Sequence, residues 1–179
     1  REIARKELSL DPDQIYCIFV GRLTQIKRPD RLLDIAALAK EKHLPVHILI
    51  AGEGDLFDIT KERAAREHLP ITFFGWRSDI ARINAASDIA ILTSDNEGIP
   101  LTLIQAAQAG LPIVAPKVGS IAEIVIDGET GLLTSPTAVD MYEALEKMVH
   151  DSTLRVTVGS AGKARAEALF SLDKSLNDH

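Results

Sequence analysis

Short apolar segments alternate with segments of helical periodicity along nearly the whole chain. The apolar segments at 15–20, 46–51, 71–74, 89–93 and 112–115 lack the regular apolar–polar alternation of a strand with one face in water. Continuous apolar strands of this kind are typical of parallel sheets that are covered on both faces. The sequence therefore predicts an α/β fold, a single doubly wound parallel sheet with helices on both faces.

The segments between the predicted strands have the 3.6-residue spacing of amphipathic helices. In residues 29–42, for example, apolar residues recur at 32, 33, 35, 36, 38 and 39. Further helices are predicted at 56–68, 78–86, 101–109, 121–126, 138–150 and 152–169, and a sixth strand at 131–134.

Composition narrows the class of protein. The chain has 179 residues, 46% of them hydrophobic, and a formal net charge of −6. This size fits one domain, and the acidic balance argues against non-specific nucleic-acid binding. No apolar run is long enough to cross a bilayer. A single cysteine, Cys17, excludes an intramolecular disulfide and fits a cytoplasmic protein.

The two ends of the chain indicate a fragment of a longer protein. The sequence opens at Arg1, within what reads as a helix or linker, and it stops at His179 without an obvious terminator. We expect one nucleotide-binding domain over residues 1–170 and a truncated C-terminal helix or tail over 171–179.

Ligands of open α/β sheets bind beyond the carboxyl ends of the strands. The loops at those ends are expected to begin at Gly21, Gly52, Gly75, Ser94 and Pro116. Their polar residues are therefore the candidates for a functional site.

The segment at 94–114 carries the strongest local signal. Glu97 and Gly98 lie between a predicted strand and a helix, and Pro100 follows. Backbone N–H groups at a helix N-terminus bind anions, and a carboxylate accepts hydrogen bonds from hydroxyls, so this segment suits a sugar phosphate. The alternative is an ordinary acidic residue at a helix start. Gln105, on the same helix, either faces this pocket or fills a polar surface position.

Three further motifs allow both a structural and a functional interpretation. Arg22 and Lys27, after Gly21, would bind phosphate oxygens or form a solvated basic turn. The run Gly52-Glu-Gly54 lacks the third glycine of a dinucleotide-binding motif and favours a tight turn. Ser120 and Glu123 match a helix capping box, which is favoured over a catalytic role.

Taken in order, these pieces resemble one enzyme family. The motifs are Val20-Gly-Arg-Leu23 with Lys27, Ile50-Ala-Gly-Glu-Gly54, Phe73-Phe-Gly75, Ser94-x-x-Glu-Gly98, Gly110-x-Pro-Ile-Val114, Gly119 with Glu123-Ile-Val125, and Asp127-Gly-x-Thr-Gly-Leu-Leu133. Together they look like the C-terminal half of a family 4 (group 1) retaining glycosyltransferase. Such enzymes have the GT-B architecture of two Rossmann-like lobes, and the resemblance spans about residues 1–170.

The resemblance implies a donor-binding lobe, whereas the N-terminal acceptor lobe of the same parent chain is absent. The parent would transfer a hexosyl unit from a UDP- or GDP-linked sugar to a glycan, lipid or small-molecule acceptor. It would need neither a metal nor a further cofactor. Any membrane association is expected through the missing lobe, and the fragment alone should be inactive.

The resemblance also assigns roles to residues. Glu97, Arg22 and Lys27 are implied in catalysis, with Arg22 and Lys27 on the diphosphate, Glu97 on the donor sugar and main chain at 74–77 beside the base. The remaining donor-binding positions are Gly21, Gly52, Phe74, Gly75, Trp76, Arg77, Ser94, Gly98, Ile99, Pro100, Leu101, Thr102 and Gln105.

One position departs from the family pattern. Gln105 replaces the second glutamate of the Glu-x7-Glu motif, which typically accepts hydrogen bonds from the ribose. Weaker donor binding is therefore expected. Two alternatives stay open: a nucleotide-sugar epimerase of the same architecture, and a nucleotide-binding or interaction domain that has lost its chemistry.

Overall fold

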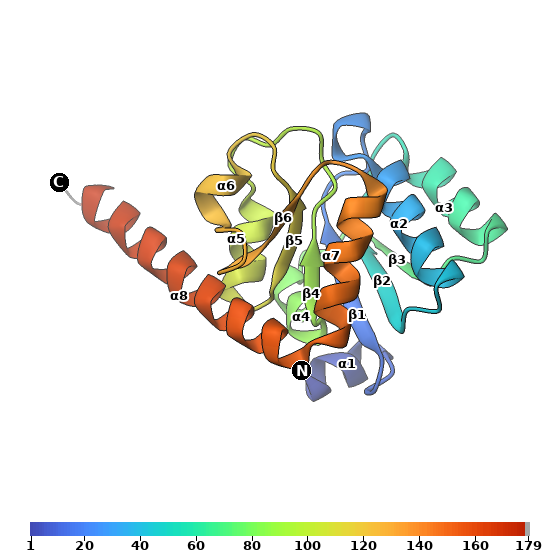
Figure 1. The fold of residues 1–179 in the computed structure, drawn as a ribbon, viewed down its shortest axis with the longest axis horizontal. Helices are drawn as coiled ribbons and strands as arrows, with labels where there is room; N and C mark the ends of the chain where they lie inside the picture. Colours follow the sequence, from blue (N-terminus) through green and yellow to red (C-terminus); the bar gives the residue numbers. More distant parts are fainter. Residues whose placement is uncertain (178–179) are drawn as a thin grey trace.

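A six-stranded parallel sheet forms the centre of the molecule (Figure 1). The structure, a computed structural model, describes residues 1–177, with side chains as far as residue 169. The strand order is β3-β2-β1-β4-β5-β6. The strands are β1 (Ile15–Val20), β2 (Val46–Ala51), β3 (Ile71–Gly75), β4 (Ile89–Ile91), β5 (Ile113–Pro116) and β6 (Gly131–Thr134).

Helices cover both faces of this sheet, as the sequence predicts. On one face α2 (Pro29–Glu41) packs against α3 (Phe57–Arg66) and α7 (Ala138–His150). On the other face lie α4 (Ile80–Ala86) and α5 (Leu101–Gln108), and α5 packs against α8 (Ser152–Asn177) (Figure 1). The remaining helices are short: α1 (Glu2–Glu7), α6 (Ile121–Ile124) and the 3-10 turn η1 (Gln25–Lys27). The predicted doubly wound, Rossmann-like fold is confirmed.

Burial on both faces explains why the strands are continuously apolar. In β1, consecutive side chains point to opposite faces of the sheet, yet Cys17, Ile18 and Phe19 are all at most 1% exposed. Burial raises the pKa of the Cys17 thiol far above its usual range, so this thiol stays protonated and behaves as a small core residue.

Two local predictions differ from the structure. Strand β4 ends at Ile91 rather than at residue 93. The Thr93 carbonyl accepts from the Arg31 side chain instead of a strand partner, and the Thr93 hydroxyl donates to the Lys27 carbonyl. The Ser120–Glu123 capping box is wrong. Ser120 has φ −88° and ψ 11°, outside the extended conformation of a typical N-cap, and its side chain makes no cap hydrogen bond.

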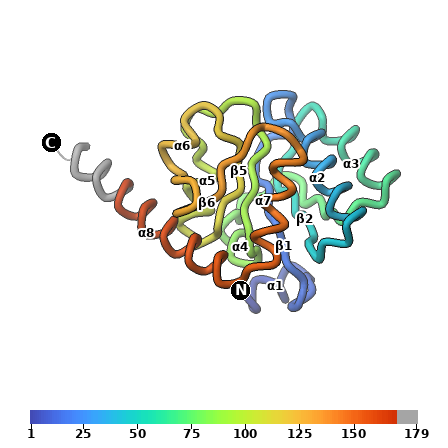
Figure 2. The backbone as a smooth tube through the Cα atoms, viewed as in Figure 1, coloured from blue at the N-terminus to red at the C-terminus, as the bar shows by residue number. Residues whose placement is uncertain are grey.

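The C-terminal helix extends beyond the body of the domain. Figure 2 shows α8 beginning close to the chain's N-terminus, and Figure 1 shows the helix leading away from the sheet. The helix runs to Asn177, so most of the predicted tail at 171–179 continues it, and the last two residues lie outside the described part. Within residues 1–177, no helix is both long and apolar enough to cross a membrane.

A buried ion pair fixes α1 to the amino end of the sheet. Arg5, only 3% exposed, donates to Asp88 Oδ2 at 2.6 Å and to the Ala86 carbonyl at 2.9 Å. Asp88 Oδ2 also accepts from the Tyr16 backbone N–H at 2.8 Å. Each charged group therefore has several partners, as burial requires.

We expect Arg5→Ala to lower the free energy of unfolding by about 3 kcal/mol, because it leaves Asp88 buried with fewer donors. Glu7→Ala is the matched control, since Glu7 also ties α1 to α4 but through an exposed pair with Arg82. The control should cost less than about 1 kcal/mol. Urea unfolding of both variants checks this, and equal losses would contradict it.

Candidate functional site

The loops that follow β1, β2 and β3 are joined at the carboxyl edge of the sheet. The Gly21 N–H donates to the Ala51 carbonyl at 3.1 Å, and the Gly52 N–H donates to the Gly75 carbonyl at 2.8 Å. These contacts extend the sheet's hydrogen bonding into the loops, so the candidate residues on them share one surface.

Glycines allow these loops to pack closely. A Cβ on Gly52 would lie 1.9 Å from the Gly21 carbonyl oxygen, and one on Gly54 would lie 2.6 Å from the Leu23 oxygen. Both glycines have φ near +150°, a conformation that other residues rarely adopt. The Gly52-Glu-Gly54 run is therefore a tight turn that packs on the loop after β1.

Three predicted site residues meet around one carboxylate oxygen. Glu97 Oε1 lies 2.5 Å from Lys27 Nζ and 2.5 Å from Ser94 Oγ. The Glu97 side chain is only 8% exposed, and the Lys27 side chain is 24% exposed. Glu97 is thus not a freely solvated residue at a helix start, because a lysine and a hydroxyl hold it.

The loop after β5 supports the Glu97 backbone. The Ser120 N–H donates to the Glu97 carbonyl at 3.1 Å. A Cβ on Gly119 would lie 2.0 Å from that same oxygen, and the φ of Gly119 is +51°. Gly119 therefore allows the backbone after β5 to pack closely against the Glu97 loop and hold it in position.

A second group of predicted residues lines a neighbouring pocket of about 480 Å³. Arg22 is exposed and makes no ion pair within residues 1–169, so its guanidinium is available to a ligand. Trp76 is 71% exposed at the rim. The predicted residues in the lining are Gly21, Arg22, Gly52, Trp76 and Arg77.

Residues at the end of β3 have fixed positions. Arg77 forms two hydrogen bonds with Asp79 at 2.6 and 2.7 Å, which raise the pKa of the guanidinium, and it lies over the Phe74 ring. Glu53 Oε1 accepts from the Trp76 backbone N–H at 3.2 Å. Gly75 has φ +65°, a left-handed conformation that glycine adopts without a steric cost.

The start of α5 presents a mostly apolar rim. Ile99 and Leu101 are 76% and 62% exposed, Gly98 borders open space and Pro100 is the buried N-cap. Gln105 is exposed on α5, and no hydrogen bond links its side chain to the described residues.

Thr102 belongs to neither group of site residues. It lines a small internal cavity with Leu103 and Ala106. The structure thus places half of the predicted residues in the Glu97 cluster or the lining of the Arg22 pocket. The others are Phe74 and Gly75 at the end of β3, and Gly98, Ile99, Pro100, Leu101, Thr102 and Gln105 on α5 or just before it.

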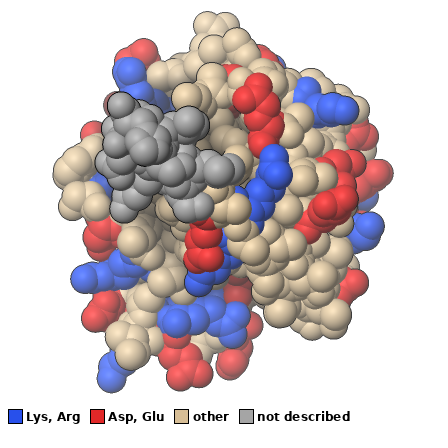
Figure 3. All heavy atoms as spheres, turned by 90° about the vertical axis from the view of Figure 1, so that its left-hand side faces the viewer, with Lys and Arg blue, Asp and Glu red and all other residues tan. Residues whose placement is uncertain are grey.

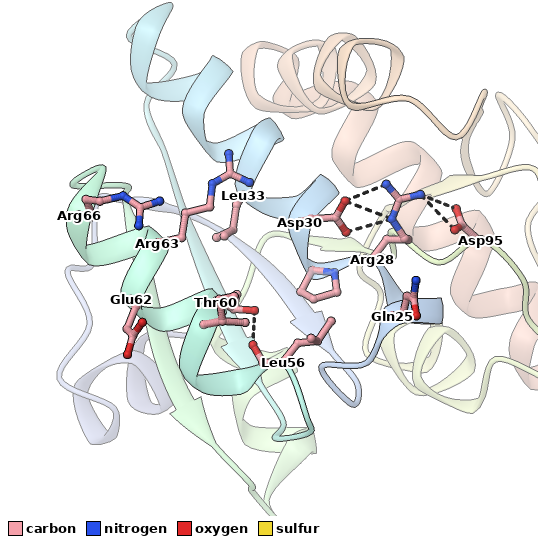
Figure 4. A pocket seen from close by; sticks show the side chains of 12 residues that line it. Gln25, Arg28, Asp30, Leu33, Leu56, Thr60, Glu62, Arg63, Arg66 and Asp95 are labelled. Carbon is pink, nitrogen blue, oxygen red and sulfur yellow. Dashed lines mark hydrogen bonds and ion pairs between the residues drawn. The ribbon is translucent and has the colours of Figure 1, made fainter.

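A larger pocket, of about 650 Å³, lies between α2 and α3 (Figure 4). Arg28, Asp30 and Asp95 line one end, and Arg63 and Arg66 lie toward the other. Each arginine there has a carboxylate partner: Asp30 and Asp95 for Arg28, Asp34 and Glu67 for Arg63, and Glu67 for Arg66. This pocket adjoins the Glu97 loop but contains none of the predicted site residues.

Several residues of this region had no signal in the sequence. Glu53 belongs to the recognised glycine turn, but its contact with Trp76 depends on how two loops pack. Arg31 and Asp95, which hold the loop after β4, resemble ordinary surface charges of a helix and a turn. Among residues 1–169, no group of three or more His, Cys, Asp or Glu side chains is arranged to hold a metal.

Surface charge is mixed on the face seen in Figure 3. Basic and acidic side chains are interspersed there, and no continuous basic area is visible. Non-specific binding of nucleic acid relies on such an area.

Residues 1–165 match the family model described as "Glycosyl transferases group 1", and the chain belongs to this family. Curated relatives include D-inositol 3-phosphate glycosyltransferases. That of Pseudarthrobacter chlorophenolicus is 28% identical over 93% of this chain and 42% of its own length. That of Mycolicibacterium gilvum is 34% identical over 79% of this chain and 33% of its own length.

Solved structures share the fold. HepE of Anabaena, in complex with UDP and glucose, is 24% identical with a TM-score of 0.86, over 98% of this chain and 51% of that one. The C-terminal domain of LpcC, a group 1 glycosyl transferase of Francisella tularensis, is 21% identical with a TM-score of 0.83, over 95% of this chain and 92% of that one. The chain spans less than half the length of the curated relatives reported above.

We expect Gly119→Ala to lower the free energy of unfolding by about 2–4 kcal/mol, since it combines a left-handed backbone with a clash against the Glu97 carbonyl. Gly128→Ala is the matched control, because Gly128 has φ +77° with open space around it. The control should cost about 1 kcal/mol. Chemical unfolding measures both, and similar losses would show that the contact with Glu97 is unimportant.

Proposed function

We propose that this chain is the donor-binding domain of a retaining, family 4 glycosyltransferase. The parent enzyme would transfer a hexosyl unit from a UDP- or GDP-linked sugar to an acceptor. The observation that carries this proposal is the Lys27–Glu97–Ser94 cluster beside the Arg22 pocket, at the carboxyl edge of a Rossmann-like sheet. Membership of the group 1 glycosyl transferases supports it.

In this proposal Arg22 and Lys27 bind the diphosphate of the donor. Arg22 offers a planar guanidinium, and Lys27 offers a point charge that at present neutralises Glu97. The N-terminus of α5, near Gly98 and Leu101, adds the positive end of a helix dipole, although the Leu101 N–H itself donates to the Ile99 carbonyl at 2.9 Å. As the sugar departs, negative charge grows on the leaving diphosphate, and fixed positive groups lower the barrier.

Glu97 is proposed to contact the donor sugar. Its Oε1 accepts from Lys27 and Ser94, which leaves the second carboxylate oxygen for hydroxyl groups of a ligand. Because its side chain is largely buried, the carboxylate is held in place before the donor binds.

The pocket lined by Gly52, Trp76 and Arg77 is proposed to hold the nucleoside. Its walls are main chain at the end of β3 together with the Trp76 ring, and backbone groups suit the edge of a base. A uridine nucleotide is supported by HepE of Anabaena, whose solved structures contain UDP or UDP-glucose.

The acceptor is proposed to bind the N-terminal lobe of the parent, which lies outside this chain. A glycan, a lipid or a small molecule all fit this scheme, and the inositol phosphate glycosyltransferases among the relatives favour a small phosphorylated acceptor. We propose a cytoplasmic parent, with any membrane contact made by the other lobe. The domain alone should bind nucleotide without turnover.

Gln105 favours one alternative, a nucleotide-binding domain without catalysis. The amide keeps one acceptor oxygen but lacks the charge of the family's second glutamate. Activity of the full-length parent, together with saturable nucleotide binding, would exclude this alternative. A nucleotide-sugar epimerase would need catalytic acids supplied largely from outside this chain.

We expect this chain to bind one of UDP, GDP and ADP saturably, as measured by calorimetric titration. The double variant Arg22→Ala/Lys27→Ala should abolish binding, because it removes both cations from the diphosphate site. Lys61→Ala/Arg66→Ala is the control, since it removes the same charge from helix α3, outside the proposed diphosphate site. If neither this chain nor its full-length parent bound any of the three nucleotides, the proposed function would be refuted.

We expect Gln105→Glu to strengthen nucleotide binding by about fivefold, because a charged acceptor gains roughly 1 kcal/mol over a neutral one. Gln108→Glu, at another exposed position of α5, controls for the added negative charge. Titration of both variants separates a ribose contact from a general charge effect. Equal changes would place Gln105 outside the site.

A further inference from the structure

We infer that Arg31 and Asp95 form a clamp that positions the Glu97 carboxylate for the donor sugar. This inference rests on the proposed function, since it assigns a positioning role within the same site. Neither residue lines the Arg22 pocket or touches Glu97, so both would act through the loop that carries it.

The guanidinium of Arg31 holds two points on that loop. Arg31 Nη1 donates to the Thr93 carbonyl at 2.5 Å, and Arg31 Nη2 donates to Asp95 Oδ1 at 2.7 Å. These two partners flank Ser94, whose hydroxyl donates to Glu97. The fork of one arginine therefore fixes the residues on both sides of the serine that holds Glu97.

Burial makes this contact difficult to replace. Arg31 is only 6% exposed, so its charge needs the partners that it has. The Asp95 side chain is 46% exposed and also accepts from Arg28 at 3.0 Å. The two guanidinium groups, Arg31 first, hold the pKa of Asp95 below its usual range, so Asp95 is charged at neutral pH.

The same loop is joined to the turn that carries Lys27. The Asp95 N–H donates to the Ile26 carbonyl at 2.9 Å, and Thr93 Oγ1 donates to the Lys27 carbonyl at 2.8 Å. Asp95 and Thr93, on either side of Ser94, thus also help to position the Lys27 turn against Glu97.

Asp30 provides a matched control for Asp95. Both aspartates pair with Arg28, and their side chains are similarly exposed, at 52% and 46%. Asp30 interacts with the backbone N–H of Arg31, whereas only Asp95 contacts the Arg31 guanidinium and lies on the Glu97 loop. Asp30→Ala and Asp95→Ala therefore each remove a carboxylate that pairs with Arg28. Only Asp95→Ala also removes the contact with the Arg31 guanidinium.

The first measurement is amide hydrogen exchange of the ligand-free chain. Exchange in the segment 92–101 should be about tenfold faster in Asp95→Ala than in the unsubstituted chain, because the loop opens locally more often. In Asp30→Ala it should change less than about twofold. If Asp95→Ala unfolds the chain, Asp95→Asn, which keeps one oxygen acceptor, takes its place.

The second measurement is a double-mutant cycle in the full-length parent, with dissociation constants for UDP-glucose, GDP-mannose, UDP and GDP. Asp95→Ala should weaken nucleotide-sugar binding by about tenfold, and nucleoside diphosphate binding by less, because Glu97 meets the sugar. In a Glu97→Gln background, Asp95→Ala should cost less than about twofold. A loss caused only by general destabilisation would not depend on Glu97.

The outcomes separate the clamp from the proposed function. Equal exchange in the two alanine variants, or an Asp95→Ala loss that is the same with and without Glu97, would overturn the clamp. If the wild-type parent binds none of the four ligands, the proposed function fails. The assigned role toward the donor then fails with it, while faster exchange in Asp95→Ala alone would still establish that Arg31 and Asp95 hold the loop.

Discussion

Burial of both faces of the sheet is the constraint on which the rest of the structure depends. With helices on each side, strands such as β1 hold almost only apolar side chains. Polar groups that act on a ligand are therefore confined to the ends of the strands. At the amino end, the Arg5–Asp88 pair fixes α1. The carboxyl end brings together Glu97, Lys27 and Arg22 on one surface. Because the structural ion pair lies at the opposite end of the sheet, this surface is free for binding.

The ion pair between Lys27 and Glu97 defines the electrostatics of the empty site. A buried carboxylate needs a partner, and in this chain the partner is a group that the proposed function assigns to a phosphate. Under the proposed function, a diphosphate would compete with Glu97 for that lysine or share it. The hydrogen bond from Ser94 to Glu97 is a second contact that does not involve Lys27.

Most of the fold could be predicted from the sequence because it follows from local periodicity. The strands at 15–20, 46–51 and 131–134 have the predicted bounds, and most helix ends fall within one or two residues. The errors occur where tertiary contacts override local pattern. Thr93 lies beyond the strand, where its hydroxyl donates to the Lys27 carbonyl, and Ser120 packs its backbone on Glu97 rather than capping a helix.

The candidate site could be predicted only in part. Glu97, Arg22 and Lys27 belong to recognisable motifs, and the structure places them on adjoining loops. The supporting residues Arg31, Asp95 and Glu53 could not be found, because their partners are far away in sequence or are backbone groups. A charged residue on a helix or in a turn has the same sequence signature whether it faces water or holds a loop.

The hydrogen bonds from Asp95 to Ile26 and from Thr93 to Lys27 join the loop after β4 to the loop after β1. These two loops are far apart in the sequence but lie side by side in the structure. Loops fastened at two points share their displacements, so the turn after β1 and the turn after β4 should fluctuate together rather than independently. A contact made at either turn would then reduce the mobility of both turns. When one group of a ligand has bound to one turn, the next group would bind to a turn that is already partly ordered, so its binding would cost less conformational entropy.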